Sequence, residues 1–411
     1  MNFRFGSTRT LRAFGASAAA LLLLAALAFT GTAHASSIEE DDDDVSGADR
    51  AFGPPPALLD SARRRAAETG FGWIAGVSAY VANDDNVFRS PATQERTSSA
   101  WGNAGYLRGD ARFGGSNRSL TTVTWNQTKF DAFRQIDSTH PHLSQWFQHR
   151  FSPSTALELD LDVVHQNDDA TTITGFAYTR DYSWWRYGGE AVLEYAPGER
   201  HRFRAGVEEV RKDYGEVASL NSIDWSHWRA SGSYRFRIGP GHYAGIKFER
   251  GHRVYDAEPA SLADGNEQPG NPVEKHAYRD LVLWYGAPLG SKLELDASMD
   301  LGHKTDEFQG YENYDDRTIR LGLLARPASG LELRAGLVSG HRDYDRILAD
   351  GGAMLAYDTV EARFGARVRV LGTWWVYGDV NSYQRDTNRS SGLDYRDYRG
   401  VFTRAGVSVF H

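Results

Sequence analysis

The chain has 411 residues, no cysteine and a formal net charge of −8 at pH 7. The lack of cysteine excludes disulfides, thiolate metal sites and a cysteine nucleophile. After the N-terminal segment, no stretch is long and apolar enough for a transmembrane helix. Glycine and aromatic residues are abundant, with 42 Gly, 11 Trp, 20 Tyr and 20 Phe. This composition still fits a membrane protein, because the strands of a transmembrane barrel are polar at every second residue.

The N-terminal segment 1–35 has the features of a secretory signal peptide. Arg4, Arg9 and Arg12 precede an apolar run at 15–28, and an A-x-A cleavage site follows at 33–35. Residues 36–70 form an acidic, proline-rich periplasmic tail with a short helix predicted over 57–67. We expect the acidic run at 39–44 to be a solvated spacer rather than a site that recruits a cation or a basic partner. The helix, with arginines at 63–65, could plug the lumen or dock on a periplasmic partner, but we favour neither.

Residues 71–411 repeat one unit: two strands of alternating apolar and polar residues, a tight turn, and a longer polar loop. The pattern is clearest at 157–163, where Leu159 and Leu161 alternate with Glu158, Asp160 and Asp162. The predicted strands are 72–82, 99–113, 119–130, 142–152, 156–166, 184–196, 201–212, 225–237, 242–253, 276–287, 293–304, 316–326, 331–342, 357–370, 373–385 and 398–410. This rhythm is typical of an all-β, transmembrane, antiparallel up-and-down outer-membrane barrel of about 16 strands. An even strand number places both termini in the periplasm of a Gram-negative cell, with the long loops outside.

The register follows from the cost of charge in lipid. An arginine facing lipid at mid-depth costs about 2–4 kcal/mol, so the charged residues of the strands must face the lumen. The predicted lumen-wall residues are Glu158, Asp160, Asp162, Arg235, Arg237, Glu294, Asp296, Asp300, Arg363, Arg367 and Arg369. Acidic and basic walls could oppose each other across the pore. We favour instead a lattice of ion pairs between neighbouring strands, such as Glu194 beside Arg202 and Arg204.

Tryptophans cluster near the predicted strand ends. We expect these residues to form the aromatic girdles at the two membrane interfaces. They are Trp184, Trp185, Trp225, Trp228, Trp284, Trp374 and Trp375.

Three strands end in the same tripeptide pattern, with a glycine, a histidine and then a basic residue at 251–253, 302–304 and 340–342. Strand parity points each histidine outward and each cation into the lumen, and two further strands end with an inward cation. The predicted outer-mouth cations are Lys212, Arg253, Lys304, Arg342 and Arg385. They would either form a basic ring that attracts anionic solute or polymer, or pair with the acids that follow them. We slightly favour the pairing, because exposed ion pairs form easily. The acids are Asp213, Asp256, Asp306, Asp343 and Asp386.

The two ends of the barrel sequence carry resemblances. The last strand resembles the C-terminal signal that the barrel-assembly machinery reads, with Phe410 and His411 in place of the usual terminal aromatic residue. The segment 80–89, Y-V-A-N-D-D-N-V-F-R, resembles the opening of a family of β-barrel porins whose genes often lie beside exopolysaccharide genes. The resemblance implies a passive outer-membrane conduit and brings no active-site residue with it.

No catalytic or metal-binding constellation stands out. The chain has no glycine-rich phosphate loop, no H-E-x-x-H and no spacing that singles out a Ser-His-Asp triad, so we predict no enzyme, no metal and no cofactor. The favoured function is a porin-like channel for small solutes or an exopolysaccharide export conduit. The rival is a structural or assembly barrel with a plugged lumen and a protein partner. Expected partners are outer-membrane lipid and lipopolysaccharide, the barrel-assembly machinery, and polysaccharide or small solutes, but not nucleic acid.

Overall fold

The computed structural model describes residue 54 and residues 56–86, 96–133, 137–168, 183–214, 224–268, 270–349, 352–388 and 397–411. The predicted signal peptide, the acidic run and parts of several long loops lie outside these residues. Within the described part of the chain, no helix is long and apolar enough to span a membrane.

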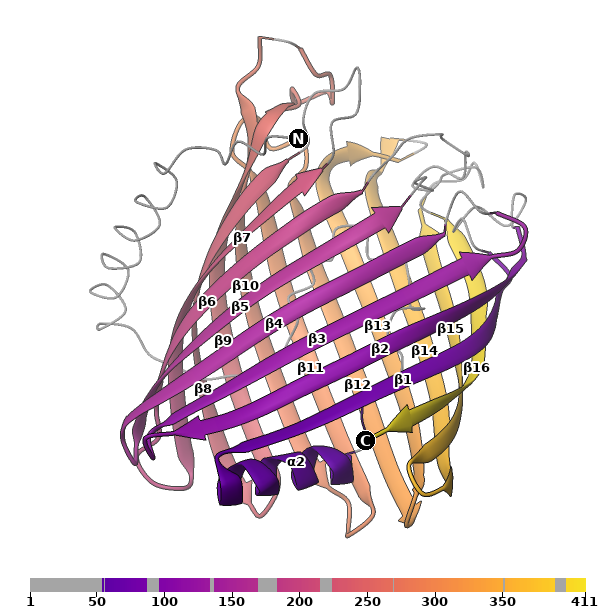
Figure 1. The fold of residues 1–411 in the computed structure, drawn as a ribbon. Coiled ribbons are helices and arrows are strands. Elements are labelled where there is room, and N and C mark those ends of the chain that lie inside the picture. The colour runs from indigo at the N-terminus through magenta and orange to yellow at the C-terminus, as the bar shows by residue number, and fades with distance from the viewer. Residues whose placement is uncertain are drawn as a thin grey trace, which may run out of the picture.

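Sixteen antiparallel strands of the described chain close into one barrel (Figure 1). They are β1 (Phe71–Asp84), β2 (Ser98–Phe113), β3 (Asn117–Phe130), β4 (Ser138–Ser152), β5 (Thr155–Asp168), β6 (Trp184–Tyr195), β7 (His201–Tyr214), β8 (Trp225–Gly239), β9 (His242–Pro259), β10 (Val273–Pro288), β11 (Leu293–Asp306), β12 (Tyr314–Ala328), β13 (Leu331–Leu348), β14 (Met354–Leu371), β15 (Trp374–Thr387) and β16 (Tyr398–Phe410). Each strand pairs with its neighbours in sequence, and β1 pairs with β16. The predicted fold class and strand number are confirmed.

The observed strands are longer than predicted at the long-loop end of the barrel. β9 continues to Pro259 and β13 to Leu348, while β10 begins at Val273 and β14 at Met354. These extensions are rich in Asp, Tyr and Arg, so they show little apolar alternation. Backbone pairing needs no apolar side chains, which explains why hydrophobic periodicity marks only the middle of each strand.

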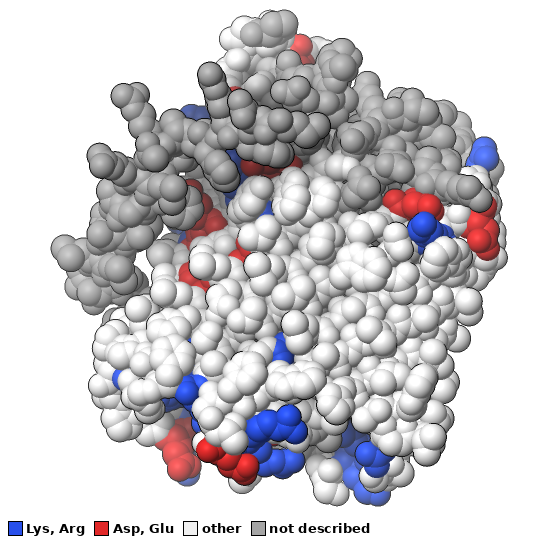
Figure 2. Space-filling model, viewed as in Figure 1, with Lys and Arg blue, Asp and Glu red and all other residues white. Residues whose placement is uncertain are grey.

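The two faces of the wall differ as the alternation predicts. On β5, Leu161 is 57% exposed on the outer face, whereas Glu158 is 9% exposed on the lumen face. Val77, Phe248 and Phe364 are likewise large, apolar and exposed on the outside. Figure 2 shows a broad, almost uncharged band across the middle of the outer face, with charged residues gathered at its two ends.

Tight turns connect the strands at the opposite end, and glycines with positive φ allow them. Gly198 between β6 and β7 has a φ of 88°, and Gly330 between β12 and β13 has a φ of 83°. An L side chain rarely adopts this conformation, so the turns depend on glycine. The C-terminus and the helix α2 (Pro56–Thr69) lie at this short-turn end (Figure 1).

Helix α2 is seated on the lumen face of the barrel wall. Ala62 forms an apolar cluster with Ile74 of β1, Trp375 of β15 and Phe410 of β16. A Cβ atom at Gly72 would overlap the carbonyl oxygen of Ala62, so the helix backbone touches the wall where the strand has no side chain. The apolar residues of this helix pack on an apolar patch at the barrel rim, whereas the acidic run expected to be a solvated spacer lies outside the described residues.

The seam between β1 and β16 is locked at both ends. At the short-turn end, the backbone N–H of His411 donates to the carbonyl of Ala75 at 2.8 Å, and Ala75 donates back at 3.0 Å. At the long-loop end, the fully buried Asn86 donates from Nδ2 to the carbonyl of Arg399 at 2.7 Å. The hydroxyl of Tyr383 donates to Asp84 at 2.9 Å. The backbone N–H of Val401 donates to Asp85 at 2.6 Å.

Candidate functional site: the lumen wall and its outer mouth

The lumen wall carries a lattice of ion pairs between neighbouring strands. Glu194 lies 3.5 Å from Arg202 and 3.8 Å from Arg204, and Arg204 also pairs with Glu158 of β5. This is the arrangement that the sequence favoured. Within the lattice each charge is partly neutralised by an adjacent strand rather than by the opposite wall.

Every predicted lumen-wall residue faces the lumen and has a close partner there. Asp160 contacts Ser144, Asp162 pairs with Arg186, Arg235 lies over Tyr243, Arg237 pairs with Glu199, Glu294 with Arg326, Asp300 with Arg320, Arg363 with Glu361, and Arg367 with Glu332, while Asp296 accepts from Tyr243 and Arg369 donates to Ser329.

Glu332, at the start of β13, is a node of this lattice. Its carboxylate lies 2.7 Å from Arg334, 2.9 Å from Arg367 and 3.5 Å from Arg326. Arg367 is 2% exposed and lies over the ring of Trp375 at 5.5 Å, next to the cluster that receives α2. The short-turn rim of the lumen is thus rigidly cross-linked by charge.

The five predicted mouth cations face the lumen, and none of them is fully exposed. Lys212 is 4%, Arg253 5% and Lys304 9% exposed, while Arg342 and Arg385 are half-buried. Each of the five lies over aromatic rings of adjacent strands. The distances to ring centroids are 4.6 Å from Lys212 to Trp184, 4.1 Å from Arg253 to Trp225, 5.6 Å from Lys304 to Tyr314, 4.0 Å from Arg342 to Tyr314, and 4.8 Å from Arg385 to Tyr357.

Aromatic and basic residues therefore alternate, strand by strand, from β6 to β16. We call this set the cation–aromatic belt: Trp184, Lys212, Trp225, Arg253, Tyr278, Lys304, Tyr314, Arg342, Tyr357, Arg385 and Tyr398. A cation over an aromatic face is attracted by the ring quadrupole, by about 0.5–2 kcal/mol depending on desolvation. The belt thus holds basic groups in place around most of the outer mouth.

The acids expected to neutralise the mouth cations have other partners. Lys304 pairs with Glu312 at 2.6 Å and Arg342 with Asp316 at 3.1 Å, rather than with Asp306 and Asp343. Asp213 and Asp256 both bind Arg211, Asp306 accepts from the backbone of Phe308 and Tyr311, Asp343 pairs with His341, and Asp386 accepts from Gln384. The expectation of local pairing is wrong for Lys304 and Arg342. Asp306 faces the same side as Lys304 but is held by the backbone N–H groups of Phe308 and Tyr311, and Asp343 is adjacent to Arg342 and therefore faces the opposite side.

The three histidines of the repeated tripeptide point outward, as strand parity predicts. His252 lies 3.1 Å from Glu307, His303 lies 2.9 Å from Asp315, and His341 lies 2.7 Å from Asp358. The alternation within each tripeptide thus separates an outer histidine from an inner cation.

The tryptophan girdles are only half confirmed. Trp185, Trp228 and Trp374 face outward and are 44–50% exposed. Trp184, Trp225, Trp284 and Trp375 face the lumen instead, and three of them belong to the belt or to the cluster around α2. Adjacent residues of a strand point to opposite faces, so a tryptophan pair can place only one ring on the outside.

A basic cavity of about 490 Å³ lies at the short-turn rim, between the ends of β6, β7, β8 and β9. Its lining includes Arg200, Arg202, Arg235 and Arg237. Basic groups are therefore concentrated near both ends of the lumen.

Sequence reasoning missed one cluster beside the belt, formed by Glu274, His276 and Glu312. Glu274 and His276 are two residues apart on β10 and share its lumen face, whereas Glu312 comes from the next long connection. The E-x-H spacing was the available signal, but it says nothing about the third residue.

Comparisons with known proteins give likeness of fold only. No family model matches the chain, and no curated protein matches its sequence. An anion-selective porin from Comamonas acidovorans is 10% identical, with 83% of this chain and 99% of that chain covered, and a TM-score of 0.43. OprB of Pseudomonas putida is 10% identical, with 86% and 97% covered and a TM-score of 0.46. OmpT of Vibrio cholerae is 9% identical, with 83% and 98% covered and a TM-score of 0.43.

Such low identities and TM-scores say nothing about function, which has to be inferred from the chain's own residues. Those residues define a closed, sixteen-stranded antiparallel barrel with a charged lumen wall and an apolar outer face.

Proposed function

We propose that this protein is an outer-membrane channel of the porin kind that passes small hydrophilic solutes, with a preference for anions. The observation that carries the proposal is the inverted distribution of side chains around a closed barrel. Large apolar residues such as Leu161, Phe248 and Phe364 are exposed outside, while the ion-paired charges face inward. A soluble protein rarely exposes so much contiguous apolar surface, whereas a bilayer requires it.

The size of the barrel supports an aqueous path. An eight-stranded barrel is filled by its own side chains, whereas barrels of sixteen to eighteen strands leave a channel. The charged lattice would line such a path, and the long loops would face outward with both termini in the periplasm.

Anion preference is supported by the positions of the basic groups. The five belt cations encircle much of the outer mouth, and the basic cavity lies at the opposite rim. Since the belt cations are covered by their neighbours, they would act on a passing ion through their field rather than by contact.

The channel test is single-channel recording of the refolded protein in planar bilayers. We expect discrete conductance steps and a reversal potential, in a salt gradient, on the side of anion preference. Substitution of Lys212, Arg253, Lys304, Arg342 and Arg385 by Gln should reduce that preference. A matched control replaces outward-facing arginines by Gln at Arg211, Arg250, Arg279 and Arg317. An equal effect of both sets would reject the mouth ring, and a folded protein without conductance would reject the channel.

An exported polysaccharide is the narrower form of this proposal. It is supported only by the resemblance of the segment 80–89 to porins encoded beside exopolysaccharide genes. Partial block of the current by anionic oligosaccharides added from the short-turn side, but not by neutral ones of equal length, would favour it.

A plugged structural barrel is the second candidate, and the position of α2 favours it. The helix occupies the lumen face at the short-turn end, where Ala62 contacts Ile74 and Phe410. If this candidate is correct, the complete protein passes no current and a variant without residues 36–70 does.

A further inference from the structure

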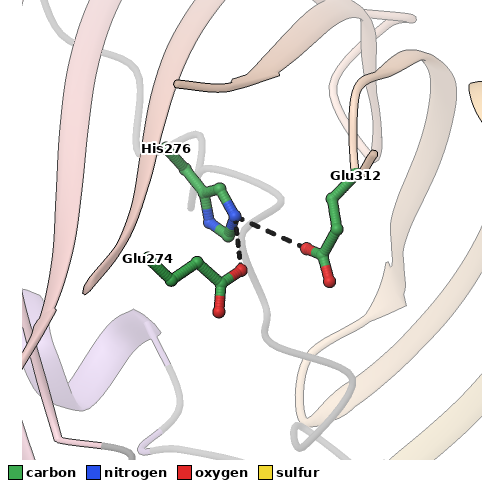
Figure 3. A group of neighbouring side chains, drawn as sticks. All are labelled: Glu274, His276 and Glu312. Carbon is green, nitrogen blue, oxygen red and sulfur yellow. Dashed lines mark ion pairs between the residues drawn. The ribbon is translucent and has the colours of Figure 1, made fainter. Parts of the chain in front are cut away.

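Two carboxylates and one imidazole converge at the long-loop end of the barrel (Figure 3). The Nε2 atom of His276 lies 2.6 Å from Glu274 Oε1 and 3.5 Å from Glu312 Oε2. Ligand atoms of the three residues all lie within 4.8 Å of one another. In Figure 3 both carboxylates point at the same ring nitrogen, one from β10 itself and one from the connection between β11 and β12.

The imidazole is buried and aimed into this cluster. His276 is 1% exposed, and its Nε2 atom makes no hydrogen bond of acceptable geometry despite its closeness to Glu274. Its other nitrogen, Nδ1, lies 3.3 Å from the hydroxyl of Tyr278. When Nδ1–H donates to that hydroxyl oxygen, Nε2 presents its lone pair to the carboxylates, which is how a second contact orients a metal-binding histidine. A buried polar nitrogen without a hydrogen-bond partner is costly, and coordination of a cation would satisfy it.

The cluster has two basic neighbours, Lys304 and Arg253, of which Arg253 lies opposite His276 on β9. Lys304 Nζ lies 2.6 Å from Glu312 Oε2. Zinc would therefore compete with Lys304 for Glu312.

We propose that Glu274, His276 and Glu312 form a zinc site, with one oxygen from each carboxylate, Nε2 of the imidazole and a water molecule as ligands. Tetrahedral Zn²⁺ with ligands at about 2.0–2.2 Å sets them about 3.3–3.5 Å apart. The distance of 3.5 Å between Glu312 and His276 already fits this value. A rotation of the Glu274 side chain would lengthen its distance of 2.6 Å from His276 to the same range. An imidazole nitrogen favours Zn²⁺ over Ca²⁺ or Mg²⁺, which prefer oxygen ligands alone.

The bound ion would fasten the β11–β12 connection to the wall of β10. Glu312 lies in that connection, and Lys304, its present partner, belongs to the belt. The zinc would take over the role of Lys304 as counter-ion and cross-link two segments at the mouth. This inference does not depend on whether the lumen conducts.

Calorimetric titration of the refolded full barrel with ZnCl₂ in detergent tests the site. We expect one zinc per chain. His276→Ala and Glu312→Gln should each weaken the affinity by at least about 10-fold, since loss of even a group behind a ligand costs about 10–100-fold. The matched control is His341→Ala. His341 also contacts two carboxylates, but through opposite ring nitrogens, 2.7 Å to Asp358 and 3.0 Å to Asp343, so its removal should leave the affinity unchanged.

A gain-of-affinity variant keeps the test decisive if the buried substitutions prevent folding. Lys304→Met removes the competing cation from Glu312, so zinc should bind more tightly to this variant than to the unaltered protein. Equal affinity in Lys304→Met, absence of zinc binding, or displacement of zinc by excess Ca²⁺ would each overturn the assignment. In the unaltered protein, zinc should also raise the temperature at which the folded form is lost on gels, by mass action.

Discussion

Asn86 and the two aspartates before it, Asp84 and Asp85, have a structural role in closing the barrel. Their segment resembles the opening of a porin family, and its side chains fasten β1 to β16 in the barrel. Asn86 is fully buried and bonded to the carbonyl of Arg399, while Asp84 and Asp85 bind Tyr383 and the backbone of Val401. Close packing adds to the lock, since a Cβ atom at Gly400 would collide with the hydroxyl of Tyr383.

We expect Asn86→Ala to destabilise the barrel by about 1–3 kcal/mol, because it leaves a buried carbonyl without its donor. The measurement is urea unfolding in lipid vesicles, followed by tryptophan fluorescence. Asn83→Ala is the control, since Asn83 is exposed near the end of β1, three residues before Asn86. Equal stability of the two variants would mean that the seam does not depend on this contact.

Helix α2 covers an apolar patch of the lumen face at the short-turn end. We predict that removal of residues 36–70 leaves insertion intact, because the sixteen strands close without the helix. The variant should appear in the outer membrane as heat-modifiable protein, but with the lumen face of Ile74 and Phe410 uncovered. Gly72→Val should mimic this effect by pushing the helix from the wall, whereas Gly105→Val, on the outer face, should not. Loss of insertion would show that the helix is part of the folding unit.

The final strand closes the barrel and carries the resemblance to a C-terminal assembly signal. Phe410 packs on α2 and β1, and His411 makes the last backbone hydrogen bonds of the seam with Ala75. We predict that truncation of Phe410 and His411 lowers outer-membrane levels more than deletion of two residues from a loop tip, because it removes both the seam contacts and the resemblance to the assembly signal. Quantitative blots of outer-membrane fractions measure this, and unchanged levels after truncation would contradict it.

The elements were predictable to different degrees, for physical reasons. Strand number, order and facing followed from alternation, since one misplaced step would put Arg363 or Arg367 into lipid. The docking of α2 did not follow, because an amphipathic helix indicates only that it has an apolar face. Only part of the cation–aromatic belt could be predicted from the sequence. Strand parity gave its cations. Its aromatic residues lie on the neighbouring strands and can be identified only from the register, as in the pairing of Lys304 with Tyr314.

At the scale of the whole molecule, eleven consecutive strands contribute alternately an aromatic ring and a cation to one circumference. No single contact in this belt is strong, and Lys304 and Arg342 each have an acid nearby. Their common height, however, makes their fields add at the centre of the mouth. Selectivity would then belong to the ring and not to any one residue.

A field of this kind predicts how selectivity depends on salt. The screening length is about 10 Å at 0.1 M ionic strength and about 3 Å at 1 M, so a covered cation reaches the pore axis only in dilute salt. We expect the anion-to-cation permeability ratio, measured from reversal potentials at a fixed gradient, to be highest at the lowest mean concentration and to approach the bulk mobility ratio near 1 M. The variant with all five belt cations changed to Gln should show little salt dependence. A ratio that stays constant across this range in the unaltered protein would mean that anions are selected by direct contact, and the basic cavity lined by Arg202 and Arg235 would then be the region to test.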